Sequence, residues 1–198
     1  AVIEGEYTDE GAIEINDNIE VKDVIFNREF ATGSLVYSTI MFPFSIETEK
    51  VSGGNFYGFN DVEGNDVHLK SVGNILEANT PYIVEATADR LTFNLKGEPV
   101  IFNTTVKNAK KSSNGIWEFI GTYEFRTWKA DDDDIGRVYG FASKTSSDPN
   151  SIGKFKMGRV GTTIKPMRAY MLYTPTKSRA LAKSLVMSTS VQQTGAPD

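Results

Sequence analysis

The side chains that most often carry catalytic chemistry are scarce in this chain. His68 is the only histidine, and cysteine is absent from the 198 residues. A Ser-His-Asp triad would have to use His68 as its base. This residue, however, alternates with Val67 and Leu69 in a short β-type segment, which is typical of a strand surface. Zinc ligands are mainly cysteine and histidine, so the sequence predicts neither a triad nor a zinc centre.

Paired carboxylates are the remaining catalytic option, because glycoside hydrolysis needs only two acids that face one cleft. Glu118 and Glu124 fall in the same phase of one predicted strand, and Asp61, Glu63 and Asp66 crowd one turn. Acids in one phase of a strand usually form its solvated face. A glycoside hydrolase is therefore the less favoured alternative, and we predict that the chain is not an enzyme.

Acidic turns raise a calcium hypothesis, because hard cations take carboxylate oxygens. The run Asp131 to Asp134 contains four aspartates, but it lacks the alternating ligands and the glycine of the helix-loop-helix calcium motif. The turn after residue 60 has better alternate spacing, although a hairpin explains it equally well. Solvated turns are the alternative in both places, and no other cofactor is expected. The candidate calcium ligands are Asp61, Glu63, Asp131 and Asp133.

Aromatic side chains suggest a second kind of site, because sugar-binding modules present aromatic rings to the apolar faces of sugars. Most aromatic residues here alternate with polar ones, and we expect them to fill the core. Trp128 differs, because it lies where a predicted strand enters the acidic run beside Lys129, and we expect it to be exposed. The candidate carbohydrate-binding residues are Trp128, Tyr57 and Trp117.

The net charge of −5 argues against a nucleic-acid partner, since such proteins normally carry a basic patch. No apolar run approaches the length of a membrane span, so membrane insertion is not expected. The first residues contain neither an initiator methionine nor a signal-peptide pattern. We interpret the chain as a piece of a longer protein, whose export signal would lie outside it.

Short β-type segments recur about every ten residues, with turn residues between them, which is the pattern of an antiparallel sandwich or barrel. We therefore predict an all-β fold, specifically a jelly-roll-like antiparallel β-sandwich over residues 19–175. Residues 1–18 are expected to be the end of a preceding segment or an edge strand. Residues 176–198 are expected to be a flexible tail or linker, with a short helix over 179–186 as the alternative.

Individual segments give sharper expectations. Leu35 to Phe42 is apolar in both phases, which predicts a central strand that ends at Pro43, with Phe42 buried. Gly64-Asn65 suits a hairpin turn. Arg28 interrupts an apolar strand face and must reach solvent or a partner. Residues 116–127 form the longest strand candidate, in which Trp117, Phe119, Tyr123 and Phe125 share one face.

The combination of motifs resembles a recurrent β-domain near the C-terminal end of large secreted surface proteins of Fibrobacter and Bacteroidetes bacteria. The resemblance covers roughly Ile19 to Thr174. Three motifs carry it: Tyr37-Ser-Thr-Ile-Met-Phe-Pro-Phe44, Asn55-Phe-Tyr-Gly-Phe59 and Leu76-Glu-Ala-Asn-Thr-Pro-Tyr-Ile-Val84. Three further segments are similar to the same family: Val24 to Phe30, Trp117 to Tyr123 and Ile164 to Tyr170.

This resemblance implies a secreted or cell-surface β-module, beside repeat or glycan-degrading modules of the same protein, and it brings no catalytic residues. The leading expectation is a non-catalytic accessory module that serves spacing, folding support or adhesion. The alternative is a carbohydrate-binding module for plant polysaccharide. The expected partners are accordingly the neighbouring modules and, in the alternative, a polysaccharide.

Overall fold

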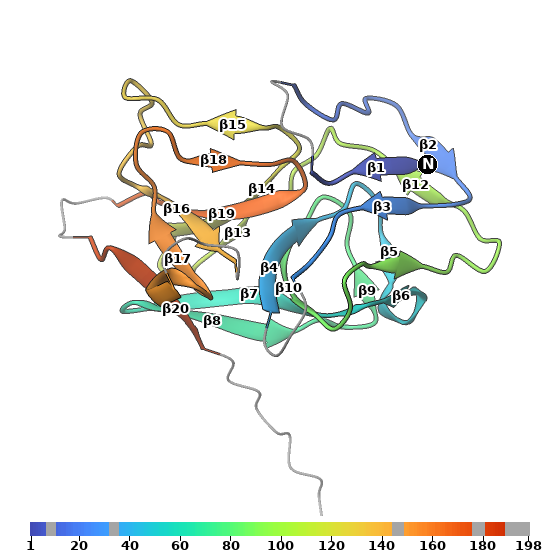
Figure 1. The fold of residues 1–198 in the computed structure, drawn as a ribbon, viewed down its shortest axis with the longest axis horizontal. Helices are drawn as coiled ribbons and strands as arrows, with labels where there is room; N and C mark the ends of the chain where they lie inside the picture. The colour runs from blue at the N-terminus through green and yellow to red at the C-terminus, as the bar shows by residue number, and fades with distance from the viewer. Residues whose placement is uncertain (7–10, 32–35, 144–148, 176–180, 189–198) are drawn as a thin grey trace, which may run out of the picture.

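The structure is a computed structural model, and it describes residues 1–6, 11–31, 36–143, 149–175 and 181–188. Strands dominate, which confirms the predicted all-β class (Figure 1). The helical elements in the described part are two single 3₁₀ turns, η1 (Thr48–Lys50) and η2 (Pro149–Ser151). No helix in these residues is long and apolar enough to cross a membrane.

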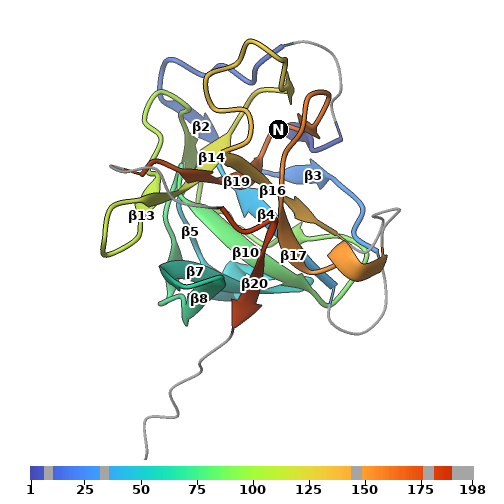
Figure 2. The same cartoon turned by 90° about the vertical axis from the view of Figure 1, so that its left-hand side faces the viewer.

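One large curled sheet forms the body of the molecule (Figures 1 and 2). Neighbouring strands are antiparallel except β20 and β8, which run parallel. In spatial order the strands are β13 (Lys110–Lys111), β14 (Trp117–Thr122), β19 (Arg168–Tyr173), β16 (Val138–Ala142), β17 (Lys154–Met157), β20 (Ser184–Ser188), β8 (Asp66–Ser71), β7 (Gly54–Glu63), β10 (Pro81–Ala86) and β4 (Val36–Met41). The jelly-roll arrangement stays a prediction.

Five two-stranded sheets flank this body. The parallel pair β1 and β3 lies at the N-terminal end of the chain, so the edge-strand alternative fits residues 2–4. The pairs are β1 (Val2–Glu4) with β3 (Ile25–Asn27), β2 (Ile19–Val21) with β12 (Val100–Phe102), β5 (Ile46–Glu47) with β9 (Ile75–Leu76), β6 (Val51–Ser52) with β11 (Thr92–Phe93), and β15 (Arg126–Thr127) with β18 (Thr163–Ile164).

The hairpin of β7 and β8 forms as predicted. Its two-residue loop is Gly64-Asn65, and Gly64 takes a positive φ of 60°, which suits the twist of the flanking strands. β7 is ten residues long, whereas β14, which forms within the predicted longest strand, has six residues. The 116–127 segment is broken after β14, where the Thr122 hydroxyl accepts the Glu124 N–H at 3.0 Å. This turn sends Phe119 and Tyr123 to different cores instead of one shared face.

Strand β4 is the last strand of the ladder, not a central one as predicted, yet five of its six residues are buried. The curl of the sheet explains this burial, because β4 meets the start of β19 across the fold. The Met41 N–H donates to the Met167 carbonyl at 3.2 Å, and the Ala169 N–H donates to Thr39 Oγ1 at 2.9 Å. The strand ends before Pro43, as predicted.

The described residues form three hydrophobic clusters: a first and a second core on the two faces of the sheet, and a smaller cluster of Trp128, Val138 and Tyr170. Along β10, Tyr82, Val84 and Ala86 enter the first core and Ile83 enters the second, so both faces of the strand are buried. Phe42 is confirmed as buried at 1 % exposure, and its ring stacks on Phe44 with the centroids 5.5 Å apart. The first core also holds Phe26, Phe56, Phe93 and Phe102, and the second holds Phe59, Trp117, Phe119, Tyr139, Phe155 and Tyr173.

The predicted tail contains a strand of the main sheet. β20 pairs with β17 and β8, and its Leu185 is fully buried in the second core. Residues 184–188 are therefore neither a flexible linker nor part of a helix. The rest of the predicted tail, residues 176–180 and 189–198, lies outside the described residues.

Candidate functional site

The two tryptophans predicted to bind sugar do not form an exposed platform. Trp117 is 6 % exposed and Trp128 only 1 %, so the expectation of an exposed Trp128 was wrong. The Arg126 guanidinium covers its ring at 4.7 Å, and Tyr170 packs edge-on at 5.3 Å. Tyr57, the third candidate, is half-buried and keeps its hydroxyl at a polar contact.

The acidic run folds as a loop in which one arginine holds two of the four aspartates. Arg126 Nη2 lies 3.0 Å from Asp134 Oδ1 and 3.8 Å from Asp132 Oδ2, which also accepts the Lys129 N–H. The candidate calcium ligands Asp131 and Asp133 carry the exposed side chains of this loop. The alternation explains the run, because Asp132 and Asp134 face Arg126 while their neighbours point to solvent.

The other calcium candidates lie on the β7–β8 hairpin. Asp61 Oδ1 accepts the N–H groups of Val62 and Ser113 at 2.8 and 3.0 Å, and the contact with Ser113 lowers the pKa of the Asp61 carboxyl. Glu63 is exposed and lies 3.8 Å from His68. Over the described ranges, no three His, Cys, Asp or Glu residues gather in a group that could hold a metal ion. The calcium hypothesis stays a prediction.

The two candidate glycosidase acids are held by lysines. Glu118 pairs with Lys111 at 2.7 Å, and the exposed Glu124 pairs with Lys107 at 3.6 Å. Neither acid lines the large cleft described below. His68 Nδ1 lies 3.2 Å from the Ser188 hydroxyl, where it joins β8 to β20.

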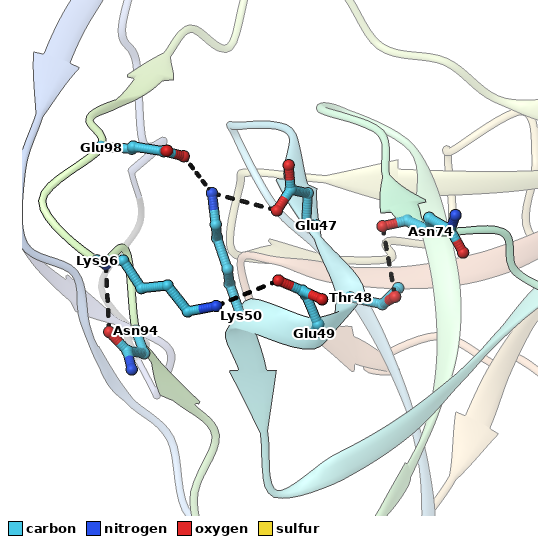
Figure 3. Close-up of polar contacts among 8 residues, drawn as sticks. All are labelled: Glu47, Thr48, Glu49, Lys50, Asn74, Asn94, Lys96 and Glu98. Carbon is cyan, nitrogen blue, oxygen red and sulfur yellow. Dashed lines mark hydrogen bonds and ion pairs between the residues drawn. The ribbon is translucent and has the colours of Figure 1, made fainter.

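A further group of charged residues lies around the 3₁₀ turn η1 and shows how this chain pairs its ionic side chains. Lys50 lies between Glu47, at 3.2 Å, and Glu98 (Figure 3). Beside it Lys96 pairs with Glu49 at 3.2 Å. The hydrogen bond to Glu98 raises the pKa of Lys50, and the same contact lowers the pKa of Glu98. Each cation here has a carboxylate partner.

A cleft of about 820 Å³ opens along the N-terminal half of β4 and forms the candidate site. Its walls come from distant parts of the chain: the end of β1, the segment after β3, β4 itself, β16, and the segment that joins β18 to β19. The charged lining residues are Glu4, Glu6, Arg28, Glu29, Arg90, Lys165 and Arg168, and the lining aromatic residues are Phe30, Tyr37, Trp128, Phe141 and Tyr170. Pockets of this size commonly hold small ligands.

Arg28 is the most buried cation of the cleft, at 4 % exposure. Its guanidinium donates to the Thr39 carbonyl at 2.9 Å and to the Ser38 hydroxyl, and it lies 4.4 Å from the centre of the Phe30 ring. Burial lowers the pKa of Arg28, and the nearby positive charge of Arg168 lowers it further. No described carboxylate lies within ion-pair distance of Arg28, so it reaches neutral partners rather than an anion.

Arg168 shares one carboxylate with Lys165. Its Nη2 lies 2.8 Å from Glu6 Oε1, while the other Glu6 oxygen contacts Lys165 Nζ. Burial alone would raise the pKa of Glu6, but these two cations outweigh it and the pKa is lowered. Gly5 permits this arrangement, because a Cβ there would lie 2.8 Å from the Arg28 Cβ and would push β1 away.

Two buried side-chain donors of the described residues have no hydrogen-bond partner, namely Trp128 Nε1 and Arg168 Nη1. Both belong to residues that line the cleft. Buried polar groups are nearly always paired, and an unpaired buried donor costs about 1–3 kcal/mol. Both groups are N–H donors, so the complementary ligand atom is an acceptor such as a carboxylate oxygen.

A polar aromatic cluster adjoins the cleft at Tyr37. The Tyr57 hydroxyl donates to Glu85 Oε2 at 3.0 Å, and the Tyr37 and Tyr57 rings lie 6.5 Å apart. Burial, together with the hydrogen bond to Glu85, raises the pKa of Tyr57 to about 12. Asn55 also reaches Glu85, at 3.4 Å. The strand register explains the cluster, because Glu85 pairs with Tyr37 on one side and with Asn55 on the other.

Sequence reasoning singled out Arg28 as an anomaly but missed the cleft, because Arg168 and Glu6 come from opposite ends of the chain. The chain matches no protein-family model, and neither a curated protein nor a solved structure was found to be similar to it.

Proposed function

We propose that this chain is a non-catalytic accessory module of a secreted or cell-surface bacterial protein, and that it binds an anionic ligand in the cleft beside β4. The placement in such a protein rests on the resemblance of the Tyr37–Phe44 motif and its companions. The binding role rests on one observation. The two unpaired buried donors of the described chain belong to residues that line the cleft, and the same cleft holds Arg28, a guanidinium that forms no ion pair with a described carboxylate.

The physical argument is one of uncompensated charge. Taking a cation out of water is costly unless a counter-ion and hydrogen bonds replace its hydration. Arg28 has the hydrogen bonds but forms no ion pair with a described carboxylate, and the charge of Glu6 acts on it only from beyond ion-pair distance. An anion in the cleft would supply that charge and would accept the N–H groups of Arg168 and Trp128, as a charge-assisted contact.

The cleft favours binding over catalysis, because its described carboxylates are already engaged. Glu6 contacts Lys165 and Arg168, Glu29 pairs with Arg90, and Glu4 accepts from Asn27 at 2.8 Å. A general acid or base must be able to exchange a proton at the operating pH. Carboxylates held by cations are poor candidates for this role.

Isothermal titration of the chain with acidic and neutral probes tests the proposal. The acidic probes are oligogalacturonate, hexaglutamate and inorganic phosphate, and the neutral probe is a cello-oligosaccharide. At least one acidic probe is expected to bind, and Arg168→Gln is expected to weaken it about tenfold or more, since a charge-assisted hydrogen bond contributes about 1.5–3 kcal/mol.

The matched control is Arg159→Gln, which removes an exposed guanidinium outside the cleft and should leave affinity unchanged. The proposal fails if no acidic probe binds, or if Arg168→Gln and Arg159→Gln bind the acidic probe equally well.

A further inference from the structure

We infer that the ligand of the cleft is an acidic carbohydrate, a polysaccharide segment whose uronic-acid carboxylate meets the arginines while its ring lies against Tyr37. This inference rests on the proposed function and names its ligand class. Three features support it: the net charge of the lining, the type of the unpaired groups, and the aromatic ring of Tyr37 in the lining.

The net charge of the cleft lining matches a ligand that carries one negative charge. Four cations and three carboxylates line the cleft, so it carries one net positive charge within a chain of net charge −5. Glu29 pairs with Arg90, and Glu6 bridges Lys165 and Arg168, which leaves Arg28 as the lining cation that forms no ion pair with a described carboxylate. One carboxylate neutralises this site, whereas a phosphate dianion would leave a buried negative charge.

The unpaired groups select an acceptor. The Arg168 Nη1 and Trp128 Nε1 donors lack partners, and a guanidinium presents its donors in a planar fork that fits a carboxylate. A peptide would bring one further N–H donor for each residue, which these donors cannot satisfy. A uronate brings two carboxylate oxygens, and its hydroxyl groups can donate as well as accept.

The Tyr37 side of the cleft offers what a sugar ring needs. Tyr37 is half-buried and lines the cleft, and it lies on the opposite face of β4 from Ser38, whose hydroxyl accepts from Arg28, so a ligand that contacts both sides must reach around this last strand of the sheet. Beyond Tyr37, the Glu85 carboxylate is held by Tyr57 and Asn55, at 3.0 and 3.4 Å. These three residues are not part of the cleft lining, so Tyr37 is the ring of this cluster that can meet the apolar face of a sugar in the cleft.

Tryptophan fluorescence reports on this site directly. The chain has two tryptophans, and Trp117→Phe leaves Trp128, which lines the cleft, as the only emitter. Titration of this variant with oligogalacturonate is expected to change the emission of Trp128. The methyl ester of the same oligosaccharide, which keeps the ring and loses the charge, should bind about tenfold to a hundredfold more weakly.

Two variants examine the two halves of the site. Arg28→Lys keeps the positive charge but loses the planar set of guanidinium donors, and it should weaken the binding of oligogalacturonate about tenfold. Tyr37→Ala removes the aromatic ring that would contact the sugar, and it should weaken the binding of oligogalacturonate roughly tenfold. Arg159→Lys is the control, and far-ultraviolet circular dichroism verifies that each variant is folded.

Competing ligand classes provide the decisive outcomes. Tighter binding of hexaglutamate or inorganic phosphate than of oligogalacturonate would overturn the carbohydrate inference and leave the anion-binding function standing. A methyl ester that binds as tightly as the acid would overturn the inference, because the carboxylate would then contribute nothing. Absence of binding for every acidic probe would instead refute the proposed function itself.

Discussion

At its C-terminal end, β4 runs into Phe42 and Phe44, whose rings pack among four other phenylalanines of the first core. At its N-terminal end, the same strand lines the cleft with Tyr37, Ser38 and Thr39. Both ends are largely buried, but the second lies beside Trp128 and Arg168, which carry the two unpaired buried donors of the described residues. The difference indicates a division of labour along one strand, in which one end stabilises the fold and the other holds groups suited to a ligand.

Phe42→Ala is expected to have the largest effect on the packed end. The ring is 1 % exposed and touches the rings of Phe26, Phe44 and Phe93, so truncation should lower the free energy of unfolding by about 3–5 kcal/mol. Urea denaturation measures this change. Tyr37→Phe, which removes only a hydroxyl at the cleft end, serves as the comparison and should change stability by less than about 1 kcal/mol. Equal losses in both variants would contradict the division of labour.

A matched pair of glycines probes the same contrast by adding one methyl group. A Cβ at Gly121 would lie 2.1 Å from Met41 Sδ and 3.2 Å from Met41 Cβ, at the packed end of β4. Overpacking of this kind typically costs about 1–3 kcal/mol, so Gly121→Ala should lower the thermal midpoint measurably. A Cβ at Gly140, which lines the cleft, would meet nothing within 4 Å. Gly140→Ala should therefore change stability by less than about 0.5 kcal/mol.

A destabilisation of Gly140→Ala as large as that of Gly121→Ala would show that the cleft wall is packed as tightly as the core. A neutral Gly121→Ala would show that Met41 can move aside and that this junction of β4 with β14 is loose.

The packed end is the part of the fold that the sequence predicted well. The burial of Phe42, the end of the strand before Pro43 and the Gly64-Asn65 turn all depend on local chemistry, namely hydrophobic patterning, a missing proline N–H and positive φ. The predicted position of β4, in the centre of the sheet, was wrong. A strand at the end of a curled sheet is covered on both faces, as a central strand is, so the two have the same apolar pattern. The sequence pattern indicates that a strand is buried, but it does not indicate which strands lie beside it.

The cleft could not be predicted in the same way, because its parts meet only through long-range contacts. Trp128 was expected to be exposed because acidic residues follow it, yet Arg126 and Tyr170 cover it. β20 lacked a strand signal, since its core contact in the sheet rests largely on Leu185. Arg28 was recognised as unusual, but its proximity to Arg168 arises only from the folding together of distant parts of the chain.

Glu6→Gln should have a small effect on stability and sharpens the comparison at the cleft end. Glu6 joins the end of β1 to Lys165 and Arg168, and it is partly exposed, so its loss should cost less than about 1 kcal/mol at pH 7. Because folding lowers the pKa of Glu6 from 4.5, its stabilisation is present above about pH 4.5 and is lost as the pH falls below that value. The wild-type and variant stabilities should therefore converge in acid. Glu20→Gln, on the exposed face of β2, is the control.

Binding measurements distinguish two roles of Glu6, which either positions the arginines or competes with the ligand for them. In the free cleft the Glu6 carboxylate occupies Lys165 and Arg168, so its neutralisation should strengthen the binding of an acidic ligand at pH 7 while it slightly weakens the fold. A rise in affinity together with a fall in stability is expected only where a charge of the protein competes with the ligand. A Glu6→Gln variant that loses both would mean that Glu6 positions the arginines, and that the two ends of β4 differ less than their contacts indicate.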